Sequence, residues 1–276
     1  MATTRTVNID GIDYYTSLSG TADAPVILLV HALMSNHHMF DSTVTALHKA
    51  GYRTLVFDHI GHNLTPPPSD STRSYSTEDL VQHMHALVLA ATGSPKLHAV
   101  IGCSIGGVLA LRYGMLFPTE VECVISLCAP GITSPEATKP LWTQRIELFQ
   151  RDREQLCQET VARWLPGDTP HDAAVRAEAL KHERTCSFEG YKFLADAIRG
   201  YDYAAELNKL KGVRCLVLAG GRDGAVRVEL LRELAQGIAG EGGKADFVVM
   251  EDAGHLPPMH RAEEFEKIAL DFLGRA

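Results

Sequence analysis

The feature that most constrains the fold is a series of short, almost wholly apolar runs separated by segments of helical periodicity. Runs of strand length that are apolar on both faces are typical of parallel sheets buried between helices. Regular alternation of such runs with helices indicates an α/β fold. The apolar runs are Pro25–Val30, Arg53–Phe57, Leu97–Ile101, Val121–Leu127, Val213–Ala219 and Ala245–Met250, and the helical segments are Ser42–Lys49, Ser76–Ala91, Ile105–Leu116, Val228–Ile238 and Ala262–Leu273.

Two further strands, Thr4–Ile9 and Asp13–Leu18, precede this series and are joined by Asp10-Gly11, a typical hairpin turn. The pattern therefore predicts a mostly parallel, eight-stranded sheet flanked by helices. The alternation stops after Cys128, and residues 131–200 are rich in Arg, Glu, Gln and Ala at helical spacing. We therefore expect a core formed by residues 1–130 and 201–276, with a helical cap, residues 131–200, inserted after the sixth strand.

Composition excludes several classes of function. The 276 residues carry a formal net charge of −8 and no basic run, which argues against nucleic acid or an anionic membrane as partner. No apolar stretch reaches the roughly 18 to 20 residues of a membrane span, and the N-terminus does not resemble a secretory signal. The six cysteines are scattered, without CxxC pairs, which predicts buried free thiols and a cytoplasmic protein. The sequence leaves a homodimer open.

A candidate nucleophile lies at the junction of a predicted strand and a predicted helix. The segment Gly102-Cys103-Ser104-Ile105-Gly106 has the GxSxG pattern, which is informative in this context. The glycines would remove side chains from a sharp turn that exposes the Ser104 hydroxyl, and the helix N-terminus favours developing negative charge. A glycine-rich turn with no catalytic role is the alternative.

Two further residues follow late strands in the positions that a catalytic triad requires. Asp223 comes directly after Val213–Ala219, and His255 lies in the loop after the last strand. The chain order Ser104, Asp223, His255 is that of a hydrolase in which histidine takes the serine proton and aspartate orients the histidine. An ordinary Asp-Gly turn is the alternative for Asp223, and Asp202 is the reserve candidate for the acid.

The backbone N–H groups of Ile105 and Leu33 are the candidate donors of an oxyanion hole. Leu33 follows His31-Ala32, just past the third strand. If Ala32 requires a positive φ, its methyl group adds strain of order 1 kcal/mol. We expect His31 to brace this loop rather than to catalyse.

The thirteen histidines do not form a recognisable metal motif. The nearest pairs, His37-His38, His59 with His62 and His83 with His85, lack the spacing and partners of a zinc site. The glycine pairs also lack the spacing of a nucleotide-binding loop. We therefore expect no metal and no cofactor.

The helical region strengthens a resemblance to the α/β-hydrolase superfamily, and within it to the 3-oxoadipate enol-lactonases. Four of its segments resemble theirs in type and order: Trp142-Thr-Gln-Arg145-Ile146, Ala162-Arg163-Trp164-Leu165, Ser187-Phe-Glu-Gly190-Tyr191 and Ala197-Ile198-Arg199-Gly-Tyr-Asp202-Tyr203. The resemblance implies cofactor-independent hydrolysis of a small, carboxylate-bearing lactone. It also implies that Trp142 and Trp164 contact the substrate and that Arg145 pairs with its carboxylate. Alternatively, Trp142 belongs to the core of the cap and Arg145 is solvated.

These features together predict a hydrolase that opens a small lactone or carboxylic ester through an acyl-enzyme on Ser104. Two rival hypotheses stay open. The same triad could cleave a carbon–carbon bond in a vinylogous diketone, as relatives of similar sequence do. The fold could also serve a small-molecule receptor with a slow or vestigial triad.

Overall fold

The protein is built on one eight-stranded sheet, as the apolar runs predict. The computed structural model describes residues 2–70 and 72–274. The spatial order of the strands is β1-β2-β4-β3-β5-β6-β7-β8. Their bounds are Thr3–Ile9 (β1), Ile12–Ser19 (β2), Val26–Val30 (β3), Arg53–Phe57 (β4), Leu97–Cys103 (β5), Val121–Leu127 (β6), Arg214–Gly220 (β7) and Lys244–Met250 (β8).

The first two strands form the predicted hairpin at one edge of the sheet. Asp10 and Gly11 both have positive φ, 50° and 82°, as the tight turn of a two-residue hairpin requires. Strand β2 pairs antiparallel with β1 and β4, whereas every pairing from β4 to β8 is parallel. The sheet is therefore mostly parallel, and the parallel strands share the edge at which their carboxyl ends lie.

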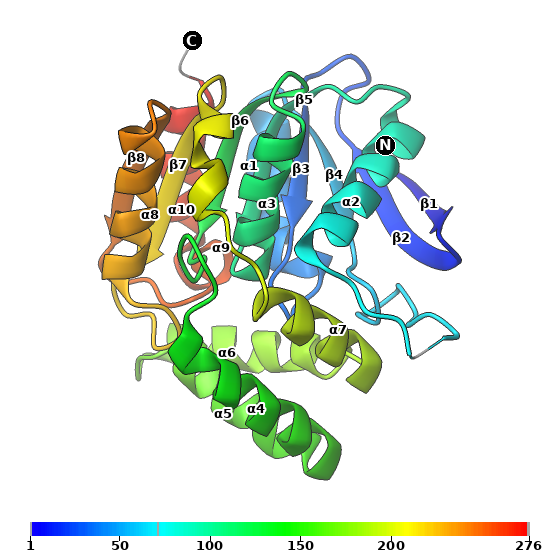
Figure 1. The fold of residues 1–276 in the computed structure, drawn as a ribbon, viewed down its shortest axis with the longest axis vertical. Coiled ribbons are helices and arrows are strands. Elements are labelled where there is room, and N and C mark those ends of the chain that lie inside the picture. The colour runs from blue at the N-terminus through cyan, green and yellow to red at the C-terminus, as the bar shows by residue number, and fades with distance from the viewer. Residues whose placement is uncertain (1, 71, 275–276) are drawn as a thin grey trace.

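Helices cover both faces of this sheet. Figure 1 shows α2, α3 and α8 on one face and α1 and α10 on the other. Ser76 and Asp79 form the capping box that begins α2, and Gly93 ends that helix with φ 74°. These helices are Asp41–Lys49 (α1), Thr77–Thr92 (α2), Ile105–Leu116 (α3), Val228–Gly240 (α8) and Ala262–Leu273 (α10), and the short elements are His37–Phe40 (η1), Ala204–Leu210 (η3) and Pro257–His260 (α9).

The helix that follows the candidate nucleophile is buried along almost its whole length. Every residue from Ile105 to Met115 is buried, because α3 packs against β5 and β6 on one side and against α2 and η3 on the other. Its one strongly basic residue, Arg112, forms ion pairs with Glu78 (2.7 Å) and Glu206 (2.9 Å). A helix held on all sides is a rigid support for the residue at its N-terminus.

Between β6 and β7 the described chain forms helices and no strand. We call α4–α7 the insertion helices: Lys139–Arg151 (α4), Arg153–Trp164 (α5), Pro170–Glu183 (α6) and Phe188–Ile198 (α7), preceded by Glu136–Thr138 (η2). Figure 1 shows them gathered at one end of the sheet, where β5 leads into α3 from its carboxyl end. The insertion helices thus cover the carboxyl ends of the parallel strands, where sites in this architecture are found.

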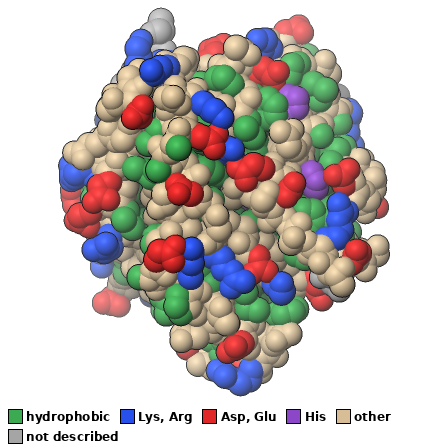
Figure 2. All heavy atoms as spheres, viewed as in Figure 1, with side chains coloured by type: hydrophobic (Ala, Val, Ile, Leu, Met, Phe, Trp, Pro, Cys, Tyr) green, Lys and Arg blue, Asp and Glu red, His purple; other side chains and the backbone are tan. Residues whose placement is uncertain are grey.

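The surface carries charges of both signs. Figure 2 shows acidic and basic side chains interspersed over the face in view. Within the described ranges, no helix has the length and hydropathy needed to cross a membrane.

Candidate active site

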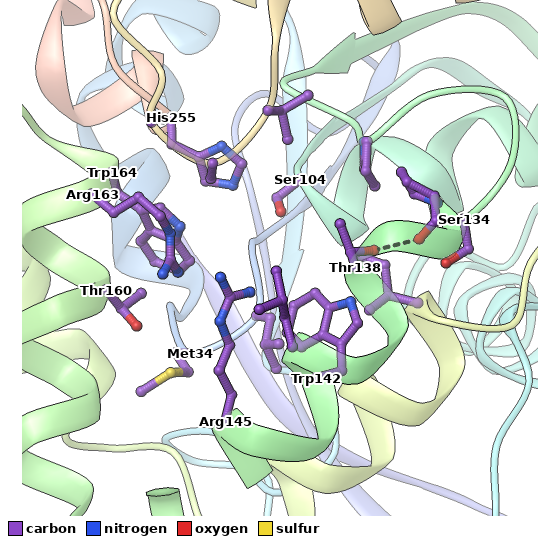
Figure 3. A pocket seen from close by; sticks show the side chains of 18 of the residues that line it. Met34, Ser104, Ser134, Thr138, Trp142, Arg145, Thr160, Arg163, Trp164 and His255 are labelled. Atoms are coloured by element: carbon purple, nitrogen blue, oxygen red, sulfur yellow. Dashed lines mark hydrogen bonds between the residues drawn. The ribbon is translucent and has the colours of Figure 1, made fainter.

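Ser104 occupies a strained turn between β5 and α3. Its φ of 58° and ψ of −119° are unusual for a residue with a side chain. The backbone is held there because the Ser104 N–H donates to Leu127 O (2.8 Å) and Ser104 O accepts from the N–H groups of Gly107 (2.9 Å) and Val108 (3.1 Å). This geometry points the hydroxyl away from the sheet and into a cavity (Figure 3).

The glycines on either side of Ser104 are required by close backbone contacts. A Cβ on Gly102 would lie 1.9 Å from Gly106 O, and a Cβ on Gly106 would lie 2.1 Å from Val30 O. Both distances are far below van der Waals contact, and the opposing atoms are backbone atoms that cannot rotate away. The sequence pattern therefore has the steric cause predicted for it.

Asp223 and His255 form a buried hydrogen-bonded pair. His255 Nδ1 lies 2.7 Å from Asp223 Oδ2, and the two side chains are 2% and 0% exposed. The other carboxylate oxygen, Oδ1, accepts from the N–H groups of Ala225 (2.7 Å) and Val226 (3.1 Å), which fixes the carboxylate in its loop. With its proton on Nδ1 toward the carboxylate, the imidazole keeps its Nε2 lone pair for another partner.

Ser104 and His255 line the same cavity, of about 220 Å³. Figure 3 shows the two side chains facing this space, which the insertion helices close from the opposite side. Within the described residues, no hydrogen bond joins the Ser104 hydroxyl to the imidazole. Such bonds often tighten only when substrate is bound. The reserve acid, Asp202, is exposed and accepts the N–H of Ala204 (2.9 Å) at the start of η3.

The two N–H groups predicted to form the oxyanion hole are free to bind a substrate oxygen. In the described part of the chain, neither the Leu33 N–H nor the Ile105 N–H donates one of the backbone hydrogen bonds that form its turns, loops and caps. Ala32 does not have a positive φ, so the strain considered for its methyl group does not arise; Met34 adopts the left-handed conformation instead, at φ 64°. The left-handed residue of this loop is therefore Met34.

Three buried histidines brace this loop, as expected for His31 but not for the other two. His31 Nε2 accepts the N–H of His59 (2.9 Å), and His59 Nε2 donates to His31 O (3.0 Å). His62 Nε2 accepts the N–H of Met34 (3.1 Å), which holds the left-handed residue in place. Burial lowers the pKa of all three, to about 3 for His59 and about 4 for His62, so each is neutral near pH 7.

The insertion helices contribute the polar and aromatic side chains of the cavity. Trp142 and Arg145 of α4 both line it, with the guanidinium 5.1 Å from the indole centroid. Trp164 of α5 also lines it and stacks on His255, with centroids 5.1 Å apart. Arg163, which sequence reasoning did not select, lies in the lining as well. Figure 3 shows Arg145 and Trp142 entering from one helix and Arg163 and Trp164 from another.

The two cavity arginines have no direct carboxylate contact in the described residues. Neither guanidinium has an ion-pair partner among the residues that the structure describes, and Arg163 Nε is buried without a hydrogen bond. Burial, followed by the charge of Arg145, lowers the pKa of Arg163. Two cations held near each other in a partly buried space favour an anionic ligand.

One group of potential metal ligands occurs in the described residues: Cys128, Asp223 and His255, with ligand atoms within 4.8 Å of one another. Its imidazole and carboxylate are already bonded to each other. Burial, and then the charge of Asp223, raises the pKa of the Cys128 thiol well above its usual value, which disfavours the thiolate that a metal would need. All six cysteines are buried and free, as predicted.

Comparison with known proteins places this geometry in a family. The family model for the alpha/beta hydrolase fold matches residues 25–166. A 2-hydroxy-6-oxononadienedioate/2-hydroxy-6-oxononatrienedioate hydrolase of Paraburkholderia phymatum is 27% identical over 86% of this chain and 81% of its own. The 3-oxoadipate enol-lactonase 1 of Acinetobacter baylyi is 24% identical over 96% and 95% of the two chains.

A solved structure agrees with these matches along the whole chain. The enol-lactonase from Burkholderia xenovorans superimposes with a TM-score of 0.85 at 27% identity, covering 98% of this chain and 100% of its own. The predicted resemblance to the superfamily is thus confirmed, as is the predicted fold. The chain belongs to the α/β-hydrolase fold family.

Proposed function

We propose that this protein is a serine hydrolase that opens a small lactone or carboxylic ester. The observation that carries the proposal is the position of Ser104, on a strained turn facing the same cavity as the imidazole of a buried Asp223–His255 pair. An alcohol is a weak nucleophile near neutral pH, so a positioned base is what gives Ser104 its reactivity. The reaction needs no cofactor.

The chemistry runs in two halves. His255 Nε2 takes the Ser104 proton while Oγ attacks the carbonyl carbon, and the N–H groups of Leu33 and Ile105 stabilise the oxyanion. Collapse breaks the carbon–oxygen bond of the ester, and the imidazolium gives its proton to the departing oxygen. Water, deprotonated by His255, then attacks the acyl-enzyme and restores the Ser104 hydroxyl. Asp223 orients the imidazole and stabilises its charged form throughout.

The size and charge of the cavity support a small, anionic substrate. Its volume of about 220 Å³ lies below the range of roughly 300 to 1,000 Å³ that is usual for drug-sized ligands. Arg145 and Arg163 would pair with a substrate carboxylate, while Trp142 and Trp164 would form apolar walls. The enol-lactonase relatives support a lactone as the class of substrate.

Assay of 3-oxoadipate enol-lactone, other lactones and simple aryl esters tests the proposal. We expect turnover by the wild-type protein, loss of it in Ser104→Ala, and no change in Ser42→Ala, which replaces an exposed serine of α1. A fluorophosphonate probe should label Ser104. Full activity in Ser104→Ala would refute the acyl-enzyme mechanism.

A carbon–carbon bond hydrolase is the second candidate. It is favoured by the Paraburkholderia relative, whose named substrates are dioates, and by the presence of two cavity arginines rather than one. Product analysis separates the two reactions. Opening a lactone gives a single hydroxy acid, or a keto acid when the lactone is an enol ester, whereas cleavage of a vinylogous diketone gives two molecules, a carboxylic acid and a dienol that tautomerises to a ketone.

A further inference from the structure

A second histidine–aspartate pair lies directly behind the candidate base. His260 of α9 places Nε2 2.9 Å from Asp172 Oδ1, and the two side chains are 0% and 1% exposed. The other ring nitrogen, Nδ1, is 2.8 Å from the backbone N of Gly254, the residue that precedes His255. An amide N–H can only donate, so Nδ1 carries the lone pair and Nε2 carries the proton. The tautomer of His260 is thus set by its two partners.

Asp172 is itself firmly held within the insertion helices. It completes the capping box of α6 by accepting the Thr169 hydroxyl (2.7 Å) and N–H (3.2 Å), and it forms an ion pair with Arg261 (3.0 Å). These hydrogen bonds, that from Thr169 first and that from His260 next, hold the pKa of Asp172 well below its usual value. The carboxylate therefore stays charged and keeps its hold on the Nε2–H of His260.

The end of α5 contacts the same loops through its backbone. The His255 N–H donates to Trp164 O (2.7 Å), and the Gly224 N–H, next to the candidate acid, donates to Arg163 O (3.2 Å). A Cβ on Gly254 would lie 2.1 Å from Trp164 O, and a Cβ on Gly224 would lie 2.6 Å from Arg163 O. The insertion helices thus press against both the acid loop and the base loop.

We propose that His260 and Asp172 are a positioning pair, which transmits the location of the insertion helices to the backbone of the base loop and so sets the direction of the His255 imidazole. This inference rests on the proposed function. In the proposed role, His260 contacts neither the substrate nor Ser104. It acts by accepting one backbone hydrogen bond at Gly254, while Asp172 holds the ring in the orientation that offers Nδ1. The insertion is then part of the catalytic framework at this end, as well as a cover over the cavity.

Two substitutions of His260 separate its two nitrogens. In His260→Asn the side-chain oxygen replaces Nδ1 and can still accept the Gly254 N–H. In His260→Gln the amide nitrogen replaces Nε2 and can still donate to Asp172, but the Gly254 N–H loses its acceptor. Because misplacement of a catalytic group by about 1 Å can cost on the order of 10²-fold in rate, we expect His260→Gln to lower kcat about 10- to 100-fold with KM unchanged. His260→Asn should lose less than tenfold, because an amide offers its oxygen to the Gly254 N–H without needing Asp172 to fix a tautomer, although Asp172 no longer orients the side chain.

A control variant and a separate readout distinguish an effect on stability from an effect on the position of His255. Ser76→Ala removes an equivalent capping box on α2, so it should lower the midpoint of urea unfolding without changing kcat. Equal loss of kcat in both His260 variants, or no loss in either, would overturn the positioning pair. If the wild-type protein turns over no ester and is not labelled at Ser104, the proposed function fails instead. In that case the low-field NMR signal of the His255 Nδ1–H still tests the positioning pair. This signal should persist in His260→Asn and shift or vanish in His260→Gln.

Discussion

Acid should destabilise this protein at a higher pH than its carboxylates alone would require, because neutral histidines brace the loop that carries Leu33. Protonation of His31 or His62 would place a second donor against the backbone N–H that its Nε2 accepts. The folded state therefore disfavours the proton, whereas the unfolded chain binds it with the ordinary pKa near 6.5. The contribution of these histidines to the free energy of unfolding is fully present above about pH 7, and it is lost as the pH falls below 6.5.

The magnitude follows from the lowered pKa values. At pH 5 the folded chain holds His62 neutral, with its pKa at about 4, while the unfolded chain is largely protonated there. The difference costs about 2 kcal/mol, since each pH unit below 6.5 contributes roughly 1.4 kcal/mol for one histidine. His59, with its pKa at about 3, contributes a similar amount, and the lowered pKa of His31 acts in the same direction. The sum is a large part of a typical stability of roughly 5 to 15 kcal/mol.

Urea unfolding at pH 7.5, 6.0 and 5.0, followed by circular dichroism, measures this loss. His62→Gln removes one of the titrating groups but leaves an oxygen that can accept the Met34 N–H. We expect the slope of unfolding free energy against pH, between pH 6 and 5, to fall by about 1.4 kcal/mol per pH unit in this variant. His38→Gln, at a half-exposed side chain, should leave the slope unchanged.

Two results would refute the reasoning. The first is a wild-type stability that stays flat between pH 7.5 and 5.0. The second is a slope that His62→Gln and His38→Gln alter equally, since the burial of His62 would then play no part in the loss.

The site supports three further predictions. Gly106→Ala should destabilise the protein by about 1 to 3 kcal/mol or more in urea unfolding, because its Cβ would lie 2.1 Å from Val30 O; Gly212→Ala, where nothing lies within 4 Å of the added Cβ, is the matched control. Asp223→Asn should lower kcat by a factor on the order of 10⁴ in steady-state assays, because the histidine loses the partner that sets its tautomer; a loss below tenfold would contradict that role. Arg163→Gln should raise KM about 10- to 100-fold for carboxylate-bearing esters but not for neutral ones, since a charge-assisted hydrogen bond is lost; equal effects on both would exclude carboxylate binding.

Much of the fold could be predicted because strands buried on both faces leave a clear sequence pattern. The runs that became β3 to β8 match the structure to within a few residues. Short elements such as α9, Pro257–His260, could not be predicted, because four residues are too few to show a helical period. The candidate triad residues were accessible to sequence reasoning for a related reason: each follows a strand, and parallel strands bring their carboxyl ends to one edge.

The supporting contacts of the site were not accessible in the same way. His62 reaches Met34 from 28 residues away, and His260 reaches Asp172 from 88 residues away, in each case from outside a strand. Side chains outside regular elements follow no period, so their partners depend on the path of the backbone between them. Arg163 lies in one of the segments that resemble the lactonases, but only the orientation of helix α5 in the structure shows that its side chain lines the cavity.

The close approach of the α5 carbonyls to Gly224 and Gly254 limits how the 131–200 region of this chain can be exchanged with that of a relative. A chimaera that receives the 131–200 region from this chain needs a host with glycine at both contact points, because any larger residue would meet a carbonyl oxygen. Conversely, a foreign helical region grafted here would leave the amides of Gly224 and His255 without acceptors unless its own backbone came equally near. Exchange of substrate specificity between relatives would therefore require these two core loops to travel with the helices.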